Sequence, residues 1–221
     1  RIAVSKACAD EIASISERSF EVIPNGVDVK WWHREQNEKN GNEVNIVYMG
    51  RADIRNGLDK VIEAFGIVRK TDPNVRLTII GDGPLLSIFK NQAKHLLPYI
   101  TFHGALSETR PDVVATADIF IFTPHIASFG ITIIEGMAAR KAIIASDIPA
   151  FKELLKNNES GLLVDPDSPE AIASAMSRLA ADKDLRFKLA ERAFRDVGKY
   201  DWENVSERII NCYEKAVSCK L

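Results

Sequence analysis

The feature that most constrains the fold of this chain is a regular alternation of short apolar runs with amphipathic helical stretches. The runs are rich in β-branched residues and occupy residues 44–50, 75–81, 100–104, 118–124, 141–146 and 161–165. Between them, apolar residues recur at helical spacing, as in the set Leu58, Val61, Ile62, Phe65 and Val68. Nearly continuous apolar strands that alternate with helices indicate a parallel sheet covered on both faces. We therefore predict an α/β fold, a Rossmann-like, doubly wound parallel sheet of about six strands.

The C-terminal part of the chain has a different character. From about Ser168 onward the patterns are helical only, and Asp167-Ser168-Pro169 offers an N-cap followed by proline in the first turn. The last segment carries one apolar stripe, made of Trp202, Val205, Ile209, Cys212 and Ala216. A helical C-terminal tail is therefore expected.

Composition excludes several classes of protein. With 46% hydrophobic residues and a net charge of -2 in 221 residues, the chain can bury a large core and has no basic excess for nucleic acid. No apolar run reaches the roughly 18–20 residues that span a bilayer. The three cysteines, Cys8, Cys212 and Cys219, are scattered, which is typical of reduced thiols in the cytosol. The chain opens without Met or a signal peptide, so we interpret it as a piece of a longer protein.

Two loops after strands carry residues suited to a ligand, because ligands of such sheets bind beyond the carboxyl ends of the strands. In "MGRADIRNG" (49–57), Gly50 precedes Arg51, whose guanidinium could grip a phosphate. A surface arginine in an ordinary loop would give the same pattern. In "IGDGP" (80–84), glycines around Asp82 permit a tight turn and close approach of a ligand to the backbone. Turn formation alone requires the same residues.

The third candidate is a helix that starts near Phe129-Gly130 and carries one acid, Glu135, among apolar residues. The free amides and positive dipole end of its first turn suit a phosphate. A carboxylate at the depth of Glu135 could accept hydrogen bonds from two vicinal hydroxyls of a ribose. The structural alternative is an acid that stabilises a helix N-terminus. Arg51, the glycine turn, the helix start and Glu135 together describe a site for a nucleoside diphosphate.

Other chemistries lack support in the sequence. The four histidines, His33, His95, His103 and His125, have no metal-ligand spacing with one another or with the cysteines. His103 and His125 fall at strand ends, so they either line the crevice or pack in loops. The sequence contains no nucleophile elbow and no G-x-G-x-x-G after a strand.

The ordered set of motifs resembles the C-terminal, donor-binding domain of retaining glycosyltransferases of family 4, which have the two-domain GT-B fold. The resemblance covers nearly the whole chain and is carried by "VIPNGVD", "GRADIRNGLDKVIEAF", "IGDGP", "ITFHGAL", "ADIFIFTP", "SFGITIIEGMA" and "YDWENV". "SFGITIIEGMAARKAIIASDIPAF" is most similar to bacterial mannosyltransferases that act on phosphatidylinositol.

The resemblance implies a nucleotide-diphosphate sugar as donor, linked to UDP or GDP, glycosyl transfer with retention, and no essential metal or other cofactor. Catalytic roles fall on Arg51, which would bind the diphosphate, and on Glu135, which would bind the ribose hydroxyls. Backbone amides of residues 130–132 would contact phosphate, and Ala105 and Leu106 would lie near the nucleobase. The expected substrate-binding residues are Gly50, Arg55, Asn56, Gly81, Asp82, Ala105, Leu106, Ala127, Ser128, Phe129, Gly130, Ile131 and Thr132.

The same resemblance implies a division of the chain. Residues 1–20 would be the trailing segment of an N-terminal domain that this chain lacks, and residues 21–200 the donor-binding domain. Residues 201–221 would form a C-terminal helix that packs toward the absent domain. We expect a cytoplasmic protein, and attachment to the inner face of the membrane through the absent domain is left open.

The chain departs from the family pattern at several positions. Asn56 stands where a lysine usually provides a second cation for the diphosphate, and Arg55 is its neighbour. Ala127 replaces the first of two acids that are separated by seven intervening residues, and this first acid usually contacts the donor sugar. Arg140 and Ala142 replace a usual glycine and proline. Two hypotheses follow: a glycosyltransferase, of which this piece alone would be inactive, or a non-catalytic homologue that acts as a binding or regulatory partner.

Overall fold

The computed structural model describes residues 1–15, 19–34 and 42–218, so Cys219 lies outside the described residues. Its centre is a parallel sheet of six strands in the order β5-β4-β3-β6-β7-β8. The strands are β3 (Val44–Met49), β4 (Val75–Ile80), β5 (Ile100–Gly104), β6 (Ile119–Phe122), β7 (Ala142–Ser146) and β8 (Leu162–Val164). The predicted doubly wound sheet of about six strands is confirmed. Most strands are slightly shorter than the apolar runs, because the runs include turn residues such as Gly50 and Gly81.

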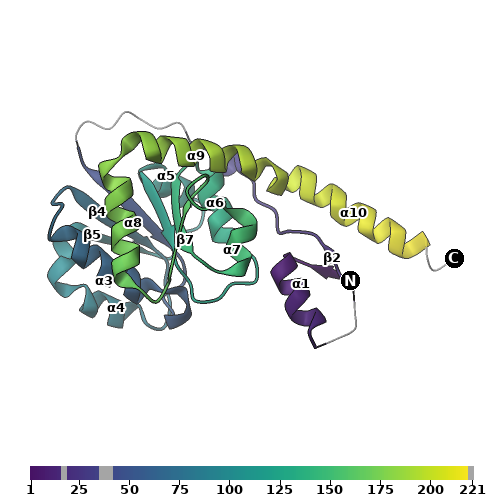
Figure 1. Cartoon of the computed structure of the whole chain (residues 1–221), viewed down its shortest axis with the longest axis horizontal. Helices are drawn as coiled ribbons and strands as arrows, with labels where there is room; N and C mark the ends of the chain where they lie inside the picture. Colours follow the sequence, from purple (N-terminus) through teal and green to yellow (C-terminus); the bar gives the residue numbers. More distant parts are fainter. Residues whose placement is uncertain (16–18, 35–41, 219–221) are drawn as a thin grey trace.

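Helices cover both faces of the sheet (Figure 1). They are α3 (Leu58–Arg69), α4 (Leu86–Gln92), α5 (Arg110–Ala115), α6 (Ile131–Ala138), α7 (Pro149–Leu154), α8 (Pro169–Ala181) and α9 (Lys183–Val197). The chain runs from β3 toward β5 in one direction and from β6 toward β8 in the other. Right-handed crossovers then place α3 and α6 on opposite faces. Helix α8 packs on α3, and α9 packs on α6.

The strand order reverses between β3 and β6, which are hydrogen-bonded neighbours in the middle of the sheet. Both strands are buried on both faces, and Tyr48 and Phe120 are among the largest fully buried side chains. In an open α/β sheet, the loops that leave such a switch point at the carboxyl ends of the strands form a crevice. The fold therefore places the loops after β3, β4, β5 and β6 around one potential ligand site.

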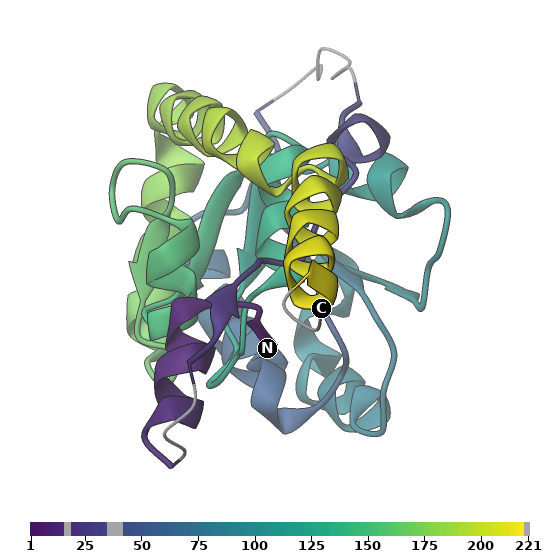
Figure 2. The same cartoon turned by 90° about the vertical axis from the view of Figure 1, so that its right-hand side faces the viewer.

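The two ends of the chain lie outside this sheet. Strand β1 (Ile2–Ala3), helix α1 (Lys6–Ala13) and strand β2 (Glu21–Val22) form a small unit, in which β1 and β2 pair in parallel. Figures 1 and 2 show this unit and α10 (Trp202–Ser218) projecting on the same side of the molecule. Helix α1 is tied to the body through Glu153 of α7, whose carboxylate accepts hydrogen bonds from the amides of Lys6 and Ala7.

The C-terminal region is helical, as predicted, and Ser168 caps α8 by accepting a hydrogen bond from the amide of Ala171. Of the predicted apolar stripe on α10, Val205 is fully buried, whereas half of the Trp202 side chain is exposed. A short helix α2 (Val29–Trp32) and the 3-10 helices Ile54–Asn56, Lys94–Tyr99 and Gly198–Tyr200 complete the described elements. Among the described residues, no helix combines the length and apolar character needed to cross a bilayer.

Candidate functional site

Backbone hydrogen bonds join the loops at the carboxyl edge of the sheet. The amide of Gly50 donates to the carbonyl of Ile80 at 3.0 Å, and the amide of Gly81 donates to the carbonyl of Gly104 at 2.8 Å. Gly81 has a φ of 142°, and a Cβ there would lie 1.8 Å from the Gly50 carbonyl oxygen. Only glycine permits this approach, so the "IGDGP" turn holds the loops after β3 and β4 against each other.

Gly130 is the N-cap residue of helix α6; it has a φ of 119°, and no side chain caps the helix. A Cβ on Gly130 would lie 2.6 Å from the ring of Phe151, so both backbone conformation and space require glycine. The carbonyl of Gly130 accepts hydrogen bonds from the amides of Ile133 and Ile134. The amides of Ile131 and Thr132 come before these two in the first turn of the helix. Such first-turn amides and the positive end of the helix dipole favour an anion.

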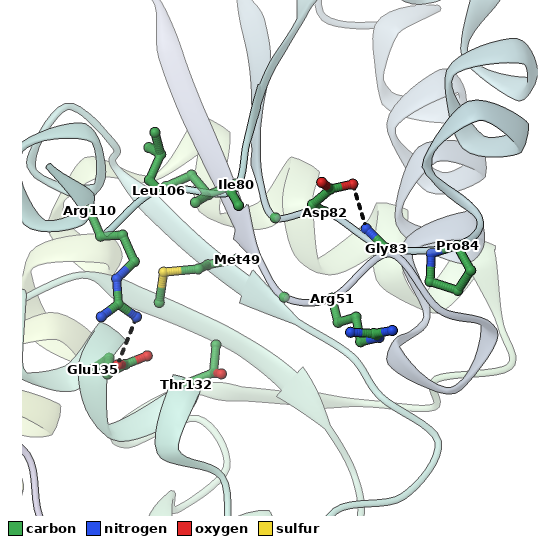
Figure 3. A pocket seen from close by; sticks show the side chains of 13 residues that line it. Met49, Arg51, Ile80, Asp82, Gly83, Pro84, Leu106, Arg110, Thr132 and Glu135 are labelled. Atoms are coloured by element: carbon green, nitrogen blue, oxygen red, sulfur yellow. Dashed lines mark hydrogen bonds and ion pairs between the residues drawn. The ribbon is translucent and has the colours of Figure 1, made fainter. Parts of the chain in front are cut away.

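These loops enclose a cleft of about 670 Å³. Its walls are formed by Met49, Gly50, Arg51, Ile80, Gly81, Asp82, Gly83, Pro84, Ala105, Leu106, Arg110, Thr132 and Glu135. Figure 3 shows Arg51, Asp82 and Pro84 at one end of this cleft and Arg110 and Glu135 at the other. The volume lies in the range of small-molecule and cofactor sites.

Glu135 is the acidic residue of an otherwise apolar helix, and only 12% of its side chain is exposed. Burial raises the pKa of its carboxyl from 4.5 to about 7, and the positive charge of Arg110 opposes this rise. The guanidinium Nη1 of Arg110 lies 3.6 Å from Oε1 of Glu135. A carboxylate whose charged form is costly, yet which faces a cleft, is a candidate for a functional group.

The structure brings eight of the predicted site residues onto the wall of the cleft: Gly50, Arg51, Gly81, Asp82, Ala105, Leu106, Thr132 and Glu135. Seven do not line it: Arg55, Asn56, Ala127, Ser128, Phe129, Gly130 and Ile131. Gly130 and Ile131 nevertheless form the start of α6, and Thr132 of that first turn reaches the wall. Arg51 has no ion-pair partner among the described residues, which leaves its guanidinium available to a ligand.

Asn56 and Arg55 have other contacts. The amide nitrogen of Asn56 donates to the Arg51 carbonyl at 2.9 Å, and the hydroxyl of Tyr48 donates to the Asn56 carbonyl at 3.1 Å. The Arg55 side chain is 72% exposed and lies 3.5 Å from the Asp53 carboxylate. Asn56 therefore braces the loop that presents Arg51, and Arg55 points to solvent rather than into the cleft.

The segment before α6 is anchored to other parts of the chain. The ring of Phe129 is buried and contacts Tyr200 edge to face, with 5.8 Å between centroids. The carbonyl of Ser128 accepts a hydrogen bond from the Ser5 hydroxyl of the N-terminal segment. Ala127 packs half-buried against the core. Ala127, Ser128 and Phe129 accordingly do not line the cleft.

Sequence reasoning missed five residues of the wall: Met49, Ile80, Gly83, Pro84 and Arg110. Gly83 and Pro84 lie within the "IGDGP" motif, and Met49 and Ile80 end their strands, so proximity to the recognised motifs could have found them. Arg110 has the same kind of signal as Arg51, a cation in the segment that follows a strand. Pro111, at the first turn of α5, marks the helix start next to it.

The histidines at strand ends do not line the cleft. Nδ1 of His125 lies 3.2 Å from the Asp167 carboxylate, and His103 is exposed. Among the described residues, no three His, Cys, Asp or Glu side chains are grouped closely enough to hold a metal ion. The polar groups at the cleft that could bind a ligand are the guanidiniums of Arg51 and Arg110, the carboxylates of Asp82 and Glu135, and the amides at the start of α6.

The matching family model is that of glycosyl transferases group 1, over residues 29–196. A phosphatidyl-myo-inositol mannosyltransferase of Mycolicibacterium smegmatis is 32% identical over 200 residues, which are 87% of this chain and 51% of that protein. An uncharacterized glycosyltransferase of Methanocaldococcus jannaschii is 26% identical, over 98% of this chain and 60% of its own length. The chain thus spans about half the length of the curated relatives it matches.

Solved structures have the same fold. The Anabaena protein HepE, in complex with UDP and glucose, has a TM-score of 0.85 at 19% identity, over 96% of this chain and 62% of its own. The C-terminal domain of a glycosyl transferase group 1 family protein from Francisella tularensis has a TM-score of 0.72 at 27% identity. There the match covers 80% of this chain and 100% of that domain. By its family model and its mannosyltransferase relatives, this chain belongs to the group 1 glycosyl transferases, and it has the sheet of their GT-B structures.

Proposed function

We propose that this chain is the donor-binding half of a retaining glycosyltransferase, and that its cleft binds a nucleotide-diphosphate sugar without an essential metal. One observation carries the proposal: Arg51, the first turn of α6 at Thr132, and Glu135 line the same cleft. A guanidinium and helix amides suit the diphosphate, and a carboxylate suits the vicinal hydroxyls of the ribose.

The chemistry of glycosyl transfer fits these groups. When the bond between the anomeric carbon and the diphosphate breaks, negative charge develops on the nucleoside diphosphate that leaves. The amides at the start of α6 are fixed in place by the helix before the reaction, and together with the Arg51 guanidinium they would stabilise that charge. Loss of one such preorganised donor typically raises the barrier by about 2.7–4 kcal/mol.

The comparisons support this assignment at two levels. HepE, whose structures contain UDP and UDP-glucose, has the same sheet, which supports a nucleotide sugar as donor here. The relatives named phosphatidyl-myo-inositol mannosyltransferase support a mannosyl donor and a glycolipid product for the whole protein.

A further N-terminal domain would supply the acceptor site and the remaining catalytic groups, so this half alone would be inactive. We place the whole protein in the cytoplasm, with any contact to the membrane made by that domain.

The test is calorimetric titration of the chain with UDP and GDP. We expect one of them to bind with a Kd near 1 mM, about -4 kcal/mol, and Glu135→Ala to abolish the binding. Glu159→Ala, which removes an exposed carboxylate in the loop before β8, is the matched control and should leave the Kd unchanged. Binding of neither nucleotide, also when the N-terminal domain is present, would contradict the proposal.

A second candidate function is a non-catalytic homologue that binds a partner. It is favoured by Asn56 and Ala127, which stand where the family resemblance implies a second cation for the diphosphate and the first of the two acids. The combined change Asn56→Lys and Ala127→Glu in the full-length protein separates the two. A rise in donor turnover would support the catalytic interpretation of these positions, and an unchanged rate would show that it is wrong.

A further inference from the structure

Arg110 is a charged residue of the cleft wall for which the proposed function gives no role. It is the first residue of α5, 25 positions before Glu135 in the chain, and its side chain is 35% exposed. Its guanidinium lies 3.6 Å from the Glu135 carboxylate, at the end of the cleft opposite Arg51 (Figure 3). Its place in the cleft therefore differs from that of the cation proposed for the diphosphate.

The Arg110 guanidinium is also held on its other side. Its central carbon lies 5.5 Å from the ring centroids of both Trp31 and Trp32, which belong to α2. The two rings contact each other edge to face at 5.0 Å, and Trp32 is buried. Two aromatic faces within about 6 Å attract a cation and restrict its position. Arg110 is therefore fixed between the tryptophan pair and Glu135.

Glu135 needs such a partner if it is to bind a diol. An ionised carboxylate accepts hydrogen bonds on both oxygens, whereas a protonated carboxyl gives up part of that capacity. Its burial favours the protonated form, and the neighbouring cation favours the ionised form. The ion pair reaches Oε1 and leaves Oε2 for a ligand.

We propose that Arg110 is a positioning residue of the donor site: it keeps the buried Glu135 carboxylate ionised and oriented, so that it accepts hydrogen bonds from the ribose hydroxyls. The inference rests on the proposed binding of a nucleotide sugar. It predicts that Arg110 acts on ribose recognition through Glu135, and that it does not act on the diphosphate directly.

The surrounding charges are consistent with this role. Arg51 and Asp82 share the cleft with Glu135, and Arg110 is the charge that lowers the Glu135 pKa against the effect of burial. Strands β6 and β7, which flank α6, contain no ionisable side chain. On the helices packed against α6, several charged groups have partners other than Glu135. These are Lys30 of α2 with Glu203, Lys152 of α7 with Asp147, Glu191 of α9 with Arg140, Arg192 of α9 with Asp196, and Glu153 of α7 with the amides of Lys6 and Ala7.

The experiment compares a ribonucleotide with its 2′-deoxy form. UDP or GDP, whichever binds more tightly, and the matching 2′-deoxy nucleoside diphosphate are titrated into the chain at pH 7.5. For the unchanged protein we expect the ribonucleotide to bind about tenfold more tightly, as for loss of a hydrogen bond to a charged group. Glu135→Gln should bring this ratio close to one. Arg110→Gln should do the same, and Arg110→Lys should keep most of the preference.

Two further measurements separate a positioning role from a merely structural one. In Arg110→Gln, the preference for ribose should return as the pH is raised to about 9.5, because Glu135 then ionises without its partner. In the double variant with Glu135→Gln, Arg110→Gln should have no additional effect. Arg34→Gln is the matched control, because Arg34 forms its ion pair with Asp112, a residue of the helix α5 that also carries Arg110, and not with Glu135. This variant should keep the tenfold ratio.

The outcomes distinguish the two proposals. If neither nucleotide binds, or if Glu135→Gln keeps the ribose preference, the proposed donor site is wrong and the role of Arg110 falls with it. If Glu135→Gln loses the preference while Arg110→Gln keeps it, the donor site stands and the positioning role is wrong. Tighter binding in Arg110→Gln would also overturn the inference, because Arg110 would then obstruct the ribose. Thermal unfolding of each variant shows whether it is folded.

Discussion

At the scale of single residues, the buried position of Glu135 lowers the stability of the folded protein. Its side chain lies on an apolar helix and is 12% exposed, so burial disfavours the ionised carboxylate, which is the form that would bind a ligand. Sites that hold a group in a costly state commonly reduce the stability of the fold. The structural alternative, an acid that stabilises the helix N-terminus, explains neither the burial nor the raised pKa.

This leads to a prediction on pH. The Glu135 pKa is about 7 in the folded protein against an ordinary 4.5, so the folded state binds the proton more tightly. Glu135 therefore lowers the free energy of unfolding very little below pH 4.5, and the loss of stability grows as the pH rises to about 7. With about 1.4 kcal/mol for each pKa unit, it reaches roughly 3 kcal/mol at pH 8. Glu135→Gln should accordingly raise the melting temperature at pH 8 by several degrees.

The comparison at low pH is the control for this prediction. At pH 5, Glu135 is largely protonated in the folded state, so the variant and the unchanged protein should melt at similar temperatures. Differential scanning calorimetry across pH 5–8 measures the difference. A variant that is less stable than the unchanged protein at pH 8 would show that the carboxylate stabilises the fold.

At the scale of elements, α6 connects fold and site, because one helix supplies both the amides of its first turn and Glu135. Its start depends on Gly130, and its end shows the same left-handed conformation at Arg140, with a φ of 55°. The family resemblance implies a glycine at that position, and a left-handed backbone conformation favours glycine. Here an arginine adopts it, and its side chain pairs with Glu191 of α9 and lies over the Phe194 ring.

The prediction at this scale concerns Gly130→Ala. A left-handed φ costs a non-glycine residue about 1–2 kcal/mol, and the contact with Phe151 adds overpacking, so we expect a loss of roughly 2–4 kcal/mol. For a domain of this size the melting temperature should fall by about 5–15 °C. UDP or GDP binding should weaken as well, because the first turn of α6 moves.

Gly198→Ala is the matched control for Gly130→Ala. Gly198 has a φ of -54°, and no neighbouring atom would lie within 4 Å of a Cβ at this position, so alanine fits without strain. It should leave stability unchanged or raise it by about 0.4–1 kcal/mol. Equal melting temperatures for the two variants would contradict the requirement for glycine at the start of α6.

At the scale of the whole molecule, α10 stands apart from the body. Its first turn is held by Val205, which is fully buried, and by Trp202, whose ring covers Gly26. Farther along, Ile210, Tyr213 and Val217 are 55–67% exposed. These three residues lie outside the stripe predicted from the sequence, in which Ile209 and Cys212 are half-buried and Ala216 is exposed. The uncovered apolar side chains suit the proposal that an N-terminal domain of the whole protein packs there.

We predict that the later part of α10 contributes little to the stability of this chain. A chain that ends at Cys212 should melt within about 2 °C of the 221-residue chain, because residues 213–218 are exposed and bury little apolar surface. Val205→Ala, which removes buried methyl groups from the same helix, should lower stability by roughly 1–2 kcal/mol. A large loss on truncation, measured by thermal unfolding, would show that the stripe is covered within the chain.

The sequence by itself determined the architecture and the edge of the sheet where the cleft lies. Strand and helix periodicities are local properties of the chain, and alternation of the two leaves a parallel sheet as the solution that buries both faces. Arg51, Asp82 and Leu106 follow strands, so their arrival at one edge could be predicted from the strand ends alone. The first turn of α6 and Glu135 could be predicted in the same way.

Only the tertiary structure decided which of the neighbouring side chains reach the cleft. Asn56 turns to the Arg51 carbonyl, and Phe129 turns to Tyr200, because each finds a partner that sequence distance does not reveal. Arg110 pairs with Glu135, which lies 25 positions later in the chain, and it contacts the tryptophans of α2, which lie even farther from it in sequence. The direction of a side chain in a loop depends on such non-local packing and charge, so it emerges only when the whole fold is assembled.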